Sequence, residues 1–336
     1  MTNKKLQDIK YSVLDLAAVK EGGNAAESFQ NSADLAQHVE QWGYTRYWMA
    51  EHHNMPAIAS SATAVAISHV AHHTSTIKVG SGGIMLPNHA PLIIAEQFGT
   101  LETLFPGRID LGLGRAPGTD QTTAYALRRH LDSNAENFPA MVDELRGYFN
   151  PELTTGIRRV RAFPGEGLDI PIWLLGSSGF SAQLAGRLGL PFSFASHFSP
   201  NNTLGALDLY RRNFEPSDTL DEPYAMVGVN VIAADTDEEA ERLATSLYQQ
   251  FLNIIRNTNK LLQPPVDNMD DIWMEHEKHA LQQQLGASVI GGPEKVKKHL
   301  QSFLDDTQAD EMIIASQIYD HEARLRSYEI VSEIVK

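Results

Sequence analysis

The sequence predicts an α/β protein that forms a closed (β/α)8 barrel, or TIM barrel, as a single domain over residues 1–336. Short β-branched or aromatic runs alternate with amphipathic helical stretches along the whole chain, and such alternation implies a parallel sheet. Eight units of this kind in 336 residues favour a closed barrel over an open sheet. Unusual polar or glycine-rich clusters follow four of the predicted strands, which is where such barrels place their functional residues.

The eight predicted strands are recognised by their β-branched and aromatic content. They cover residues 11–16, 45–49, 77–86, 108–113, 170–175, 192–195, 225–232 and 311–314. Between them, apolar residues recur at helical spacing over residues 33–42 and 237–247. Gly43 would cap the first of these helices, and Pro293 would open a helix that runs to Leu304.

Two connections are longer than ordinary barrel loops. One covers residues 150–169, before the fifth strand, and the other covers residues 257–288, between the seventh and eighth strands. The second contains a polar helical stretch over residues 275–285. Excursions of this length are typical of lids or subunit contacts.

The composition restricts the class of protein. The net charge is −15, from 27 basic and 42 acidic residues, without a long basic run. Nucleic acids and anionic membranes are therefore not expected as partners, because both require a positive face. The absence of cysteine excludes disulfides, thiolate zinc sites and a cysteine nucleophile. No stretch resembles a signal peptide or a membrane helix. We expect a globular cytoplasmic protein.

The stretch GSSGFS, residues 176–181, joins the fifth strand to a helix over residues 182–188. Small residues, hydroxyl groups and free N–H groups at a helix start can cradle a phosphate. The alternative is an ordinary serine N-cap. Arg115, just beyond the fourth strand, has the fork of donors that suits a phosphate, with a salt bridge at the rim as the alternative.

Two glycine-rich stretches require separate interpretation. The motif GLGRAP has Pro117 where a dinucleotide fingerprint needs its third glycine, so we reject that match. Glycines at positions 80, 82 and 83 weaken the third strand. They indicate a bulge or a flat ligand lying on the backbone, with a simple barrel kink as the alternative.

The second strand ends in the run Glu51-His52-His53-Asn54. Adjacent residues of a strand point to opposite sides, so the two histidines are poorly placed to bind one metal. A general acid/base or hydrogen-bonding histidine suits these positions better. His69, His72 and His73 have zinc-like helical spacing, but they lie on a predicted outer helix without the glutamate of an HExxH motif. We expect no metal site.

Four stretches in this order resemble the bacterial luciferase-like family of flavin monooxygenases: AEHHN, VGSGGIMLPNHAPLIIAEQFGTLETLFPGRIDLGLGRAPG, PIWLLGSSGFSAQLAGRLGLPFSFASHF, and GGPEKVKKHL with the later ADEMII. The resemblance covers nearly the whole chain. It implies a (β/α)8 barrel that uses reduced FMN, supplied by a separate flavin reductase, and O2 to oxygenate a small organic substrate. Family members are often dimeric, and we expect a homodimer through the helices over residues 62–73 and 91–104.

The resemblance also assigns roles to individual residues. His52 matches the active-site histidine, which would stabilise or protonate the flavin peroxide, with Glu51, His53 and Asn54 as its supports. Gly82 and Gly83 match a non-prolyl cis peptide under the flavin ring. The implied cofactor contacts are Ser81, Gly82, Gly83, Arg115, Ser177, Ser178, Gly179, Phe180 and Ser181.

The resemblance leaves several points open. Without the reactive cysteine of luciferase, light emission is not implied. The family includes deazaflavin-dependent dehydrogenases, so the cofactor and the reaction have an alternative. A metal-dependent barrel hydrolase using Glu51, His52 and His53, or a flavin-binding protein without catalysis, are hypotheses from different classes. The long insertion means that the substrate cannot be inferred by resemblance.

Overall fold

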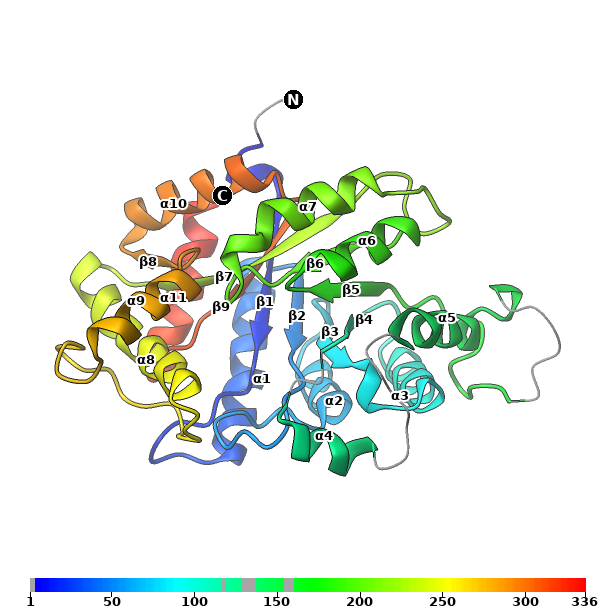
Figure 1. Cartoon of the computed structure of the whole chain (residues 1–336), viewed down its shortest axis with the longest axis horizontal. Helices are drawn as coiled ribbons and strands as arrows, with labels where there is room; N and C mark the ends of the chain where they lie inside the picture. The colour runs from blue at the N-terminus through cyan, green and yellow to red at the C-terminus, as the bar shows by residue number, and fades with distance from the viewer. Residues whose placement is uncertain (1–3, 117–118, 129–136, 154–159) are drawn as a thin grey trace.

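The structure is a computed structural model that describes residues 4–116, 119–128, 137–153 and 160–336. Eight parallel strands form a closed barrel, because β6 pairs with β7 and β9 pairs with both β1 and β7 (Figure 1). The barrel strands are β1 (Lys10–Asp15), β2 (Arg46–Met49), β3 (Lys78–Met85), β4 (Ile109–Gly114), β5 (Ile172–Gly176), β6 (Phe192–Phe194), β7 (Ala225–Ala233) and β9 (Glu311–Ala315). The predicted fold and all eight barrel strands are confirmed.

A ninth strand, β8 (Val289–Gly291), was not predicted. It pairs only with the last residues of β7, from Val231 to Ala233, and so extends the end of one barrel strand without entering the barrel. Three residues that follow a long insertion carry too little periodicity to be recognised as a strand.

Helices surround the barrel, as the alternating pattern predicts. They are α1 (Ala25–Trp42), α2 (Thr63–His73), α3 (Pro91–Leu104), α4 (Gln121–Arg128), α5 (Phe138–Phe149), α6 (Gly179–Arg187), α7 (Thr203–Arg212), α8 (Asp237–Ile255), α9 (Glu275–Gln284), α10 (Pro293–Thr307) and α11 (His321–Ile334). Short 3-10 turns lie at Leu6–Asp8, Leu86–Asn88, Pro151–Leu153 and Pro200–Asn202.

The first helix begins earlier than the sequence pattern indicates, at Ala25 and not at residue 33. Asn24 caps it by accepting a hydrogen bond from the Glu27 amide at 3.1 Å, and the polar first turns hide the helical periodicity. Its end is as predicted, since Gly43 adopts the left-handed conformation with φ 90°. Likewise α8 continues eight residues beyond the predicted 247, to Ile255, whereas α10 opens on Pro293 as expected.

The glycines of β3 and β4 allow these two strands to approach closely. A Cβ atom at Gly112 would lie 2.1 Å from the carbonyl oxygen of Ser81, and one at Gly80 would lie 2.3 Å from that of Asp110. The register shifts between Gly82 and Ile84, as a bulge or kink at these glycines would produce, and the Gly82–Gly83 peptide is cis.

A layer of charged side chains fills the interior of the barrel near the amino ends of the strands. The Arg46 guanidinium lies 2.6 Å from Asp110 and 3.0 Å from Glu311, and all three residues are buried. Tyr224 donates to Glu311 at 2.8 Å, and Trp48 donates to Asp110 at 3.2 Å. This layer closes the barrel below the ring of Trp48.

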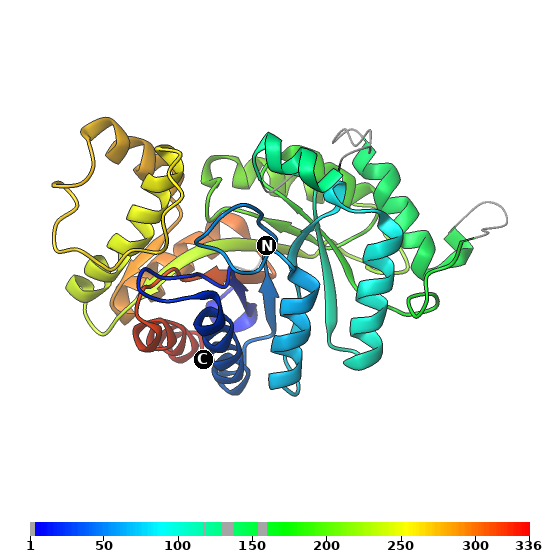
Figure 2. The same ribbon diagram turned by 90° about the horizontal axis from the view of Figure 1, so that it is seen from below.

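The insertion between β7 and β9 forms one end of the molecule. Figure 2 shows α8 and α9 at the end opposite α5. A backbone bridge between Lys20 and Leu262 ties the insertion to the loop after β1. Among the helices of the described residues, none is both long and apolar enough to cross a membrane.

Candidate active site

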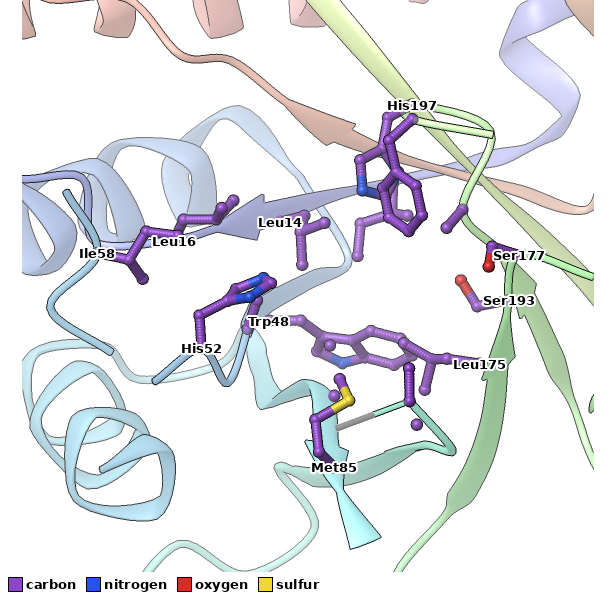
Figure 3. Close-up of a pocket in the computed structure, with 18 of the residues that line it drawn as sticks. Leu14, Leu16, Trp48, His52, Ile58, Met85, Leu175, Ser177, Ser193 and His197 are labelled. Atoms are coloured by element: carbon purple, nitrogen blue, oxygen red, sulfur yellow. The ribbon is translucent and has the colours of Figure 1, made fainter. Parts of the chain in front are cut away.

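A cavity of about 420 Å³ lies at the carboxyl ends of the barrel strands. The indole of Trp48 faces it (Figure 3). Trp48 also packs edge-on against Trp173, with ring centroids 5.2 Å apart. Because Trp48 also bonds to the charged layer, it separates the cavity from the barrel interior below. Most of the other lining side chains are apolar, such as Leu14, Leu16 and Ile58.

The GSSGFS stretch borders this cavity. Gly176, Ser177, Ser178 and Ser181 line it, and α6 begins at Gly179 with Ser178 as its N-cap residue. The Ser178 side chain makes no capping hydrogen bond, whereas the N-cap side chains of α1, α8 and α11 each accept one. The arrangement therefore differs from an ordinary serine cap and leaves hydroxyl and N–H donors beside the cavity.

Arg115 lines the same side of the cavity, directly after β4. Its guanidinium lies 4.3 Å from the centre of the Phe180 ring. Within the described parts of the chain, Arg115 takes part in no ion pair, so the salt bridge considered as an alternative does not form there. Pro117, on which we rejected the dinucleotide motif, lies outside the described residues.

The bulge of β3 forms another wall. Gly82 and Gly83 line the cavity, and a Cβ at Gly82 would lie 2.7 Å from Leu14 Cδ1. Ser81 instead turns to the neighbouring strand, where its hydroxyl donates to the Gly112 carbonyl at 2.8 Å. Of the predicted cofactor contacts that the structure describes, Ser81, Gly179 and Phe180 are not among the lining residues.

The two adjacent histidines diverge as strand geometry predicts. His52 lines the cavity, whereas His53 points to Glu51, with Nε2 2.7 Å from the carboxylate. Asn54 has a φ of 56° and donates to Asp120 at 3.0 Å, away from the lining residues.

Glu51 is the centre of a hydrogen-bonding cluster that the sequence did not reveal. Besides His53, its carboxylate accepts from His89 at 2.9 Å, from the Met85 amide at 2.9 Å and from Asn88 at 3.2 Å. Glu51 therefore joins the ends of β2 and β3 next to the cavity. Burial raises the pKa of Glu51, but the hydrogen bonds from the two histidines and Met85 outweigh it and hold the pKa at about 2.

This pKa predicts a measurable loss of stability in acid. A carboxyl whose folded pKa lies below its ordinary 4.5 stabilises the fold above that value, and this contribution disappears as the pH falls from 4.5 to about 2. The difference amounts to about 3 kcal/mol. In denaturant unfolding, the wild type should have a larger free energy of unfolding than Glu51→Gln. This difference should fall by about 3 kcal/mol between pH 4.5 and pH 2. A difference that does not depend on pH would contradict the assignment.

His197, in the loop after β6, is a lining residue that the sequence analysis missed. It lies across the cavity from His52 (Figure 3). Burial, and then the charge of His52, lower the pKa of His197 to about 4. In the sequence, the signal for this position is a histidine in the run ASHF, two residues after the end of a predicted strand.

The structure also places the other histidine cluster. His72 and His73 are exposed on α2, and His69 packs edge-on against Phe29 with ring centroids 6.4 Å apart. Within the described ranges of the chain, no three His, Asp or Glu side chains come together in a way that could hold a metal ion.

Comparison with known proteins places the chain in a family. The family model of luciferase-like monooxygenases matches residues 9–311. A luciferase-like monooxygenase of Escherichia coli strain K12 is 53% identical over 334 residues, which cover 99% of this chain and 98% of that protein.

Solved structures agree with this relationship. The crystal structure of apo-MsnO8 is 34% identical, covers 97% of this chain and 98% of its own, and has a TM-score of 0.86. The oxygenating component of the diketocamphane monooxygenase of Pseudomonas putida, in complex with FMN, shares the fold at 18% identity with a TM-score of 0.71, covering 97% of each chain. The chain belongs to the luciferase-like monooxygenase family.

Proposed function

We propose that this protein is an FMN-dependent monooxygenase that receives reduced FMN from a separate flavin reductase and uses O2 to oxygenate a small organic substrate. The observation that supports it most is the set of phosphate donors, formed by Arg115 and the start of α6, on one side of a cavity that also contains His52. The sequence has no nicotinamide-binding motif, which fits a protein that is supplied with reduced flavin.

The side chains that line the cavity suit FMN. A phosphate monoester needs charge-assisted donors, and the guanidinium of Arg115, the hydroxyls of Ser177, Ser178 and Ser181, and the N-terminus of α6 provide them. A flat ring needs a wall without side chains, and Gly82 and Gly83 provide one.

Bound reduced FMN would supply the electrons that activate O2. The protein's own groups would hold the phosphate through Arg115 and the serines, and exclude water through the aliphatic walls around Leu16 and Ile58. His52 would hold or deliver a proton at its ring nitrogen beside the reacting atoms. The Glu51 cluster would keep the backbone on either side of His52 in place through His53 and Met85.

A comparison of FMN with riboflavin tests the phosphate site. We expect wild-type protein to bind FMN at least about 10-fold more tightly than riboflavin, because charge-assisted hydrogen bonds contribute about 1.5–3 kcal/mol each. Arg115→Ala should remove most of this preference and leave riboflavin affinity unchanged. Calorimetry or fluorescence quenching gives both affinities.

The same titration separates the alternatives. Equal affinity for FMN and riboflavin would contradict the phosphate assignment. Tighter binding of a deazaflavin would favour a dehydrogenase, and one equivalent of zinc without flavin affinity would favour a hydrolase.

We also propose a homodimer that forms through α2 and α3. These helices pack against each other and expose apolar side chains: Val65 is 71% exposed, Leu104 61% and Ile93 46%. A subunit contact across these two helices would bury the exposed apolar side chains.

Light scattering after size exclusion tests the dimer. We expect wild-type protein to be dimeric at micromolar concentration, and Val65→Glu with Leu104→Glu to shift it to monomer by placing charges in an apolar contact. Leu204→Glu, on α7 and 55% exposed, is a matched control that should stay dimeric. A monomeric wild type would refute the proposal.

A further inference from the structure

His197 occupies an unusual position on the cavity wall. A Cβ at Gly228 of β7 would lie 2.3 Å from its Nδ1 and 3.0 Å from its Cε1, so this edge of the ring rests directly on the backbone of β7. Its main chain is fixed too, since Asn230 donates to the His197 carbonyl at 2.6 Å, and the Phe198 ring packs against the imidazole with centroids 4.7 Å apart.

This packing selects one tautomer of His197. Nδ1 is buried without a hydrogen-bond partner among the described residues. A buried N–H without an acceptor is rarer in proteins than a lone pair without a donor, so the proton belongs on Nε2. Because the Nδ1 edge rests on Gly228, the edge that reaches the cavity carries Nε2–H.

The cavity has two chemically different halves. The phosphate donors and the glycine wall come from β3, β4, β5 and the start of α6. The half that contains His197 is formed after β6 and by α8, α9 and β9, and its polar side chains include the neutral amides of Gln250, Gln284 and Gln317. Among the described lining residues the permanently charged group is Arg115, in the first half. Besides His52, no other described titratable group is found to act on His197.

We propose that His197 is a specificity-determining residue, whose neutral imidazole donates Nε2–H to an acceptor oxygen of an uncharged, largely apolar substrate in the half of the cavity away from the FMN phosphate. The proposal rests on the proposed function for the location of the cofactor. An uncharged donor beside neutral amides offers no counter-charge to a carboxylate, so anionic compounds should be excluded.

Three small probes of like shape test this without FMN, in buffer with saturating inorganic phosphate, so that the anion donors around Arg115 are occupied and do not attract the charged probe. Cyclohexanone carries a neutral acceptor, methylenecyclohexane replaces the oxygen with a methylene group, and cyclohexanecarboxylate carries a charge. Binding to the full-length protein is followed by calorimetry and by the imidazole NMR signal that disappears in His197→Gln. We expect the ketone to bind about threefold to tenfold more tightly than the alkene, as one neutral hydrogen bond predicts, and the carboxylate to bind most weakly.

Variants identify the donor. His197→Phe keeps a ring and should abolish the preference for ketone over alkene, whereas His197→Gln keeps an N–H donor and should restore part of it. Gly228→Ala should move the unchanged imidazole and weaken ketone binding in the same way, which provides a second test if His197→Phe does not fold. The NMR signal should also show a ring that stays neutral until the pH approaches about 4.

Each contrary outcome is specific. An unchanged ketone preference in His197→Phe, or carboxylate binding as tight as that of the ketone, would overturn the proposal. If His197→Phe loses FMN affinity while its ketone binding is unchanged, His197 donates its hydrogen bond to the flavin and not to the substrate. That result would also overturn the proposal. Failure of FMN to bind wild-type protein would refute the proposed function and leave the probe measurements valid.

Discussion

The His52→Ala variant is expected to bind FMN with an affinity within about threefold of wild type, yet to lose the influence of the protein on the reaction of reduced FMN with O2. A positioned general acid or base contributes about 10²–10⁴-fold to rate. The affinity should be nearly unchanged, because the proposed phosphate donors Arg115 and Ser181 lie directly after β4 and on α6, and not at the end of β2.

Stopped-flow absorbance measures this effect directly. Photoreduced FMN is mixed with protein and air-saturated buffer, and the return of the oxidised flavin band is timed with and without protein. His299→Ala, at an exposed histidine on α10, is the matched control and should behave as wild type. If His52→Ala also follows the wild-type time course, His52 is not the proton-carrying group, as a flavin-storage protein would predict.

The Gly112→Ala variant is expected to lose at least about 3 kcal/mol of stability and to be recovered poorly in folded form. The new Cβ would lie 2.1 Å from the Ser81 carbonyl oxygen, and the paired backbone of β3 cannot yield cheaply. Separating β3 from β4 would also disturb the hydrogen bonds of Ser81 to Gly112.

Denaturant unfolding followed by circular dichroism gives this loss. Gly205→Ala is a matched control on α7, where a Cβ meets nothing within 4 Å, and it should be neutral or stabilising by about 0.5–1 kcal/mol. Stability of Gly112→Ala within about 1 kcal/mol of wild type would show that β3 and β4 are less tightly packed than described.

The barrel could be predicted because its signal is repeated. Each strand carries its own β-branched or aromatic run and each helix its own periodicity, so an error at one boundary does not alter the architecture. The start of α1 and the strand β8 escaped prediction because local polarity or brevity removed the periodic signal.

The candidate site could be predicted where a single motif carries its residues. His52 and the GSSGFS serines stand at strand ends, and the structure brings them to one cavity. His89 and His197 escaped prediction because their importance depends on partners distant in the chain. The first meets Glu51 only when β2 and β3 pair, and the second meets Gly228 only when the barrel closes.

The layer of Arg46, Asp110 and Glu311 has a consequence for the order of events in catalysis. It gives the cavity a closed end, so every molecule enters and leaves past the carboxyl-end loops. Where cofactor and substrate share one entrance, the molecule that arrives last must depart first. Under the proposed function, steady-state kinetics should therefore be ordered, with reduced FMN as the leading reactant and the organic product released ahead of the oxidised flavin.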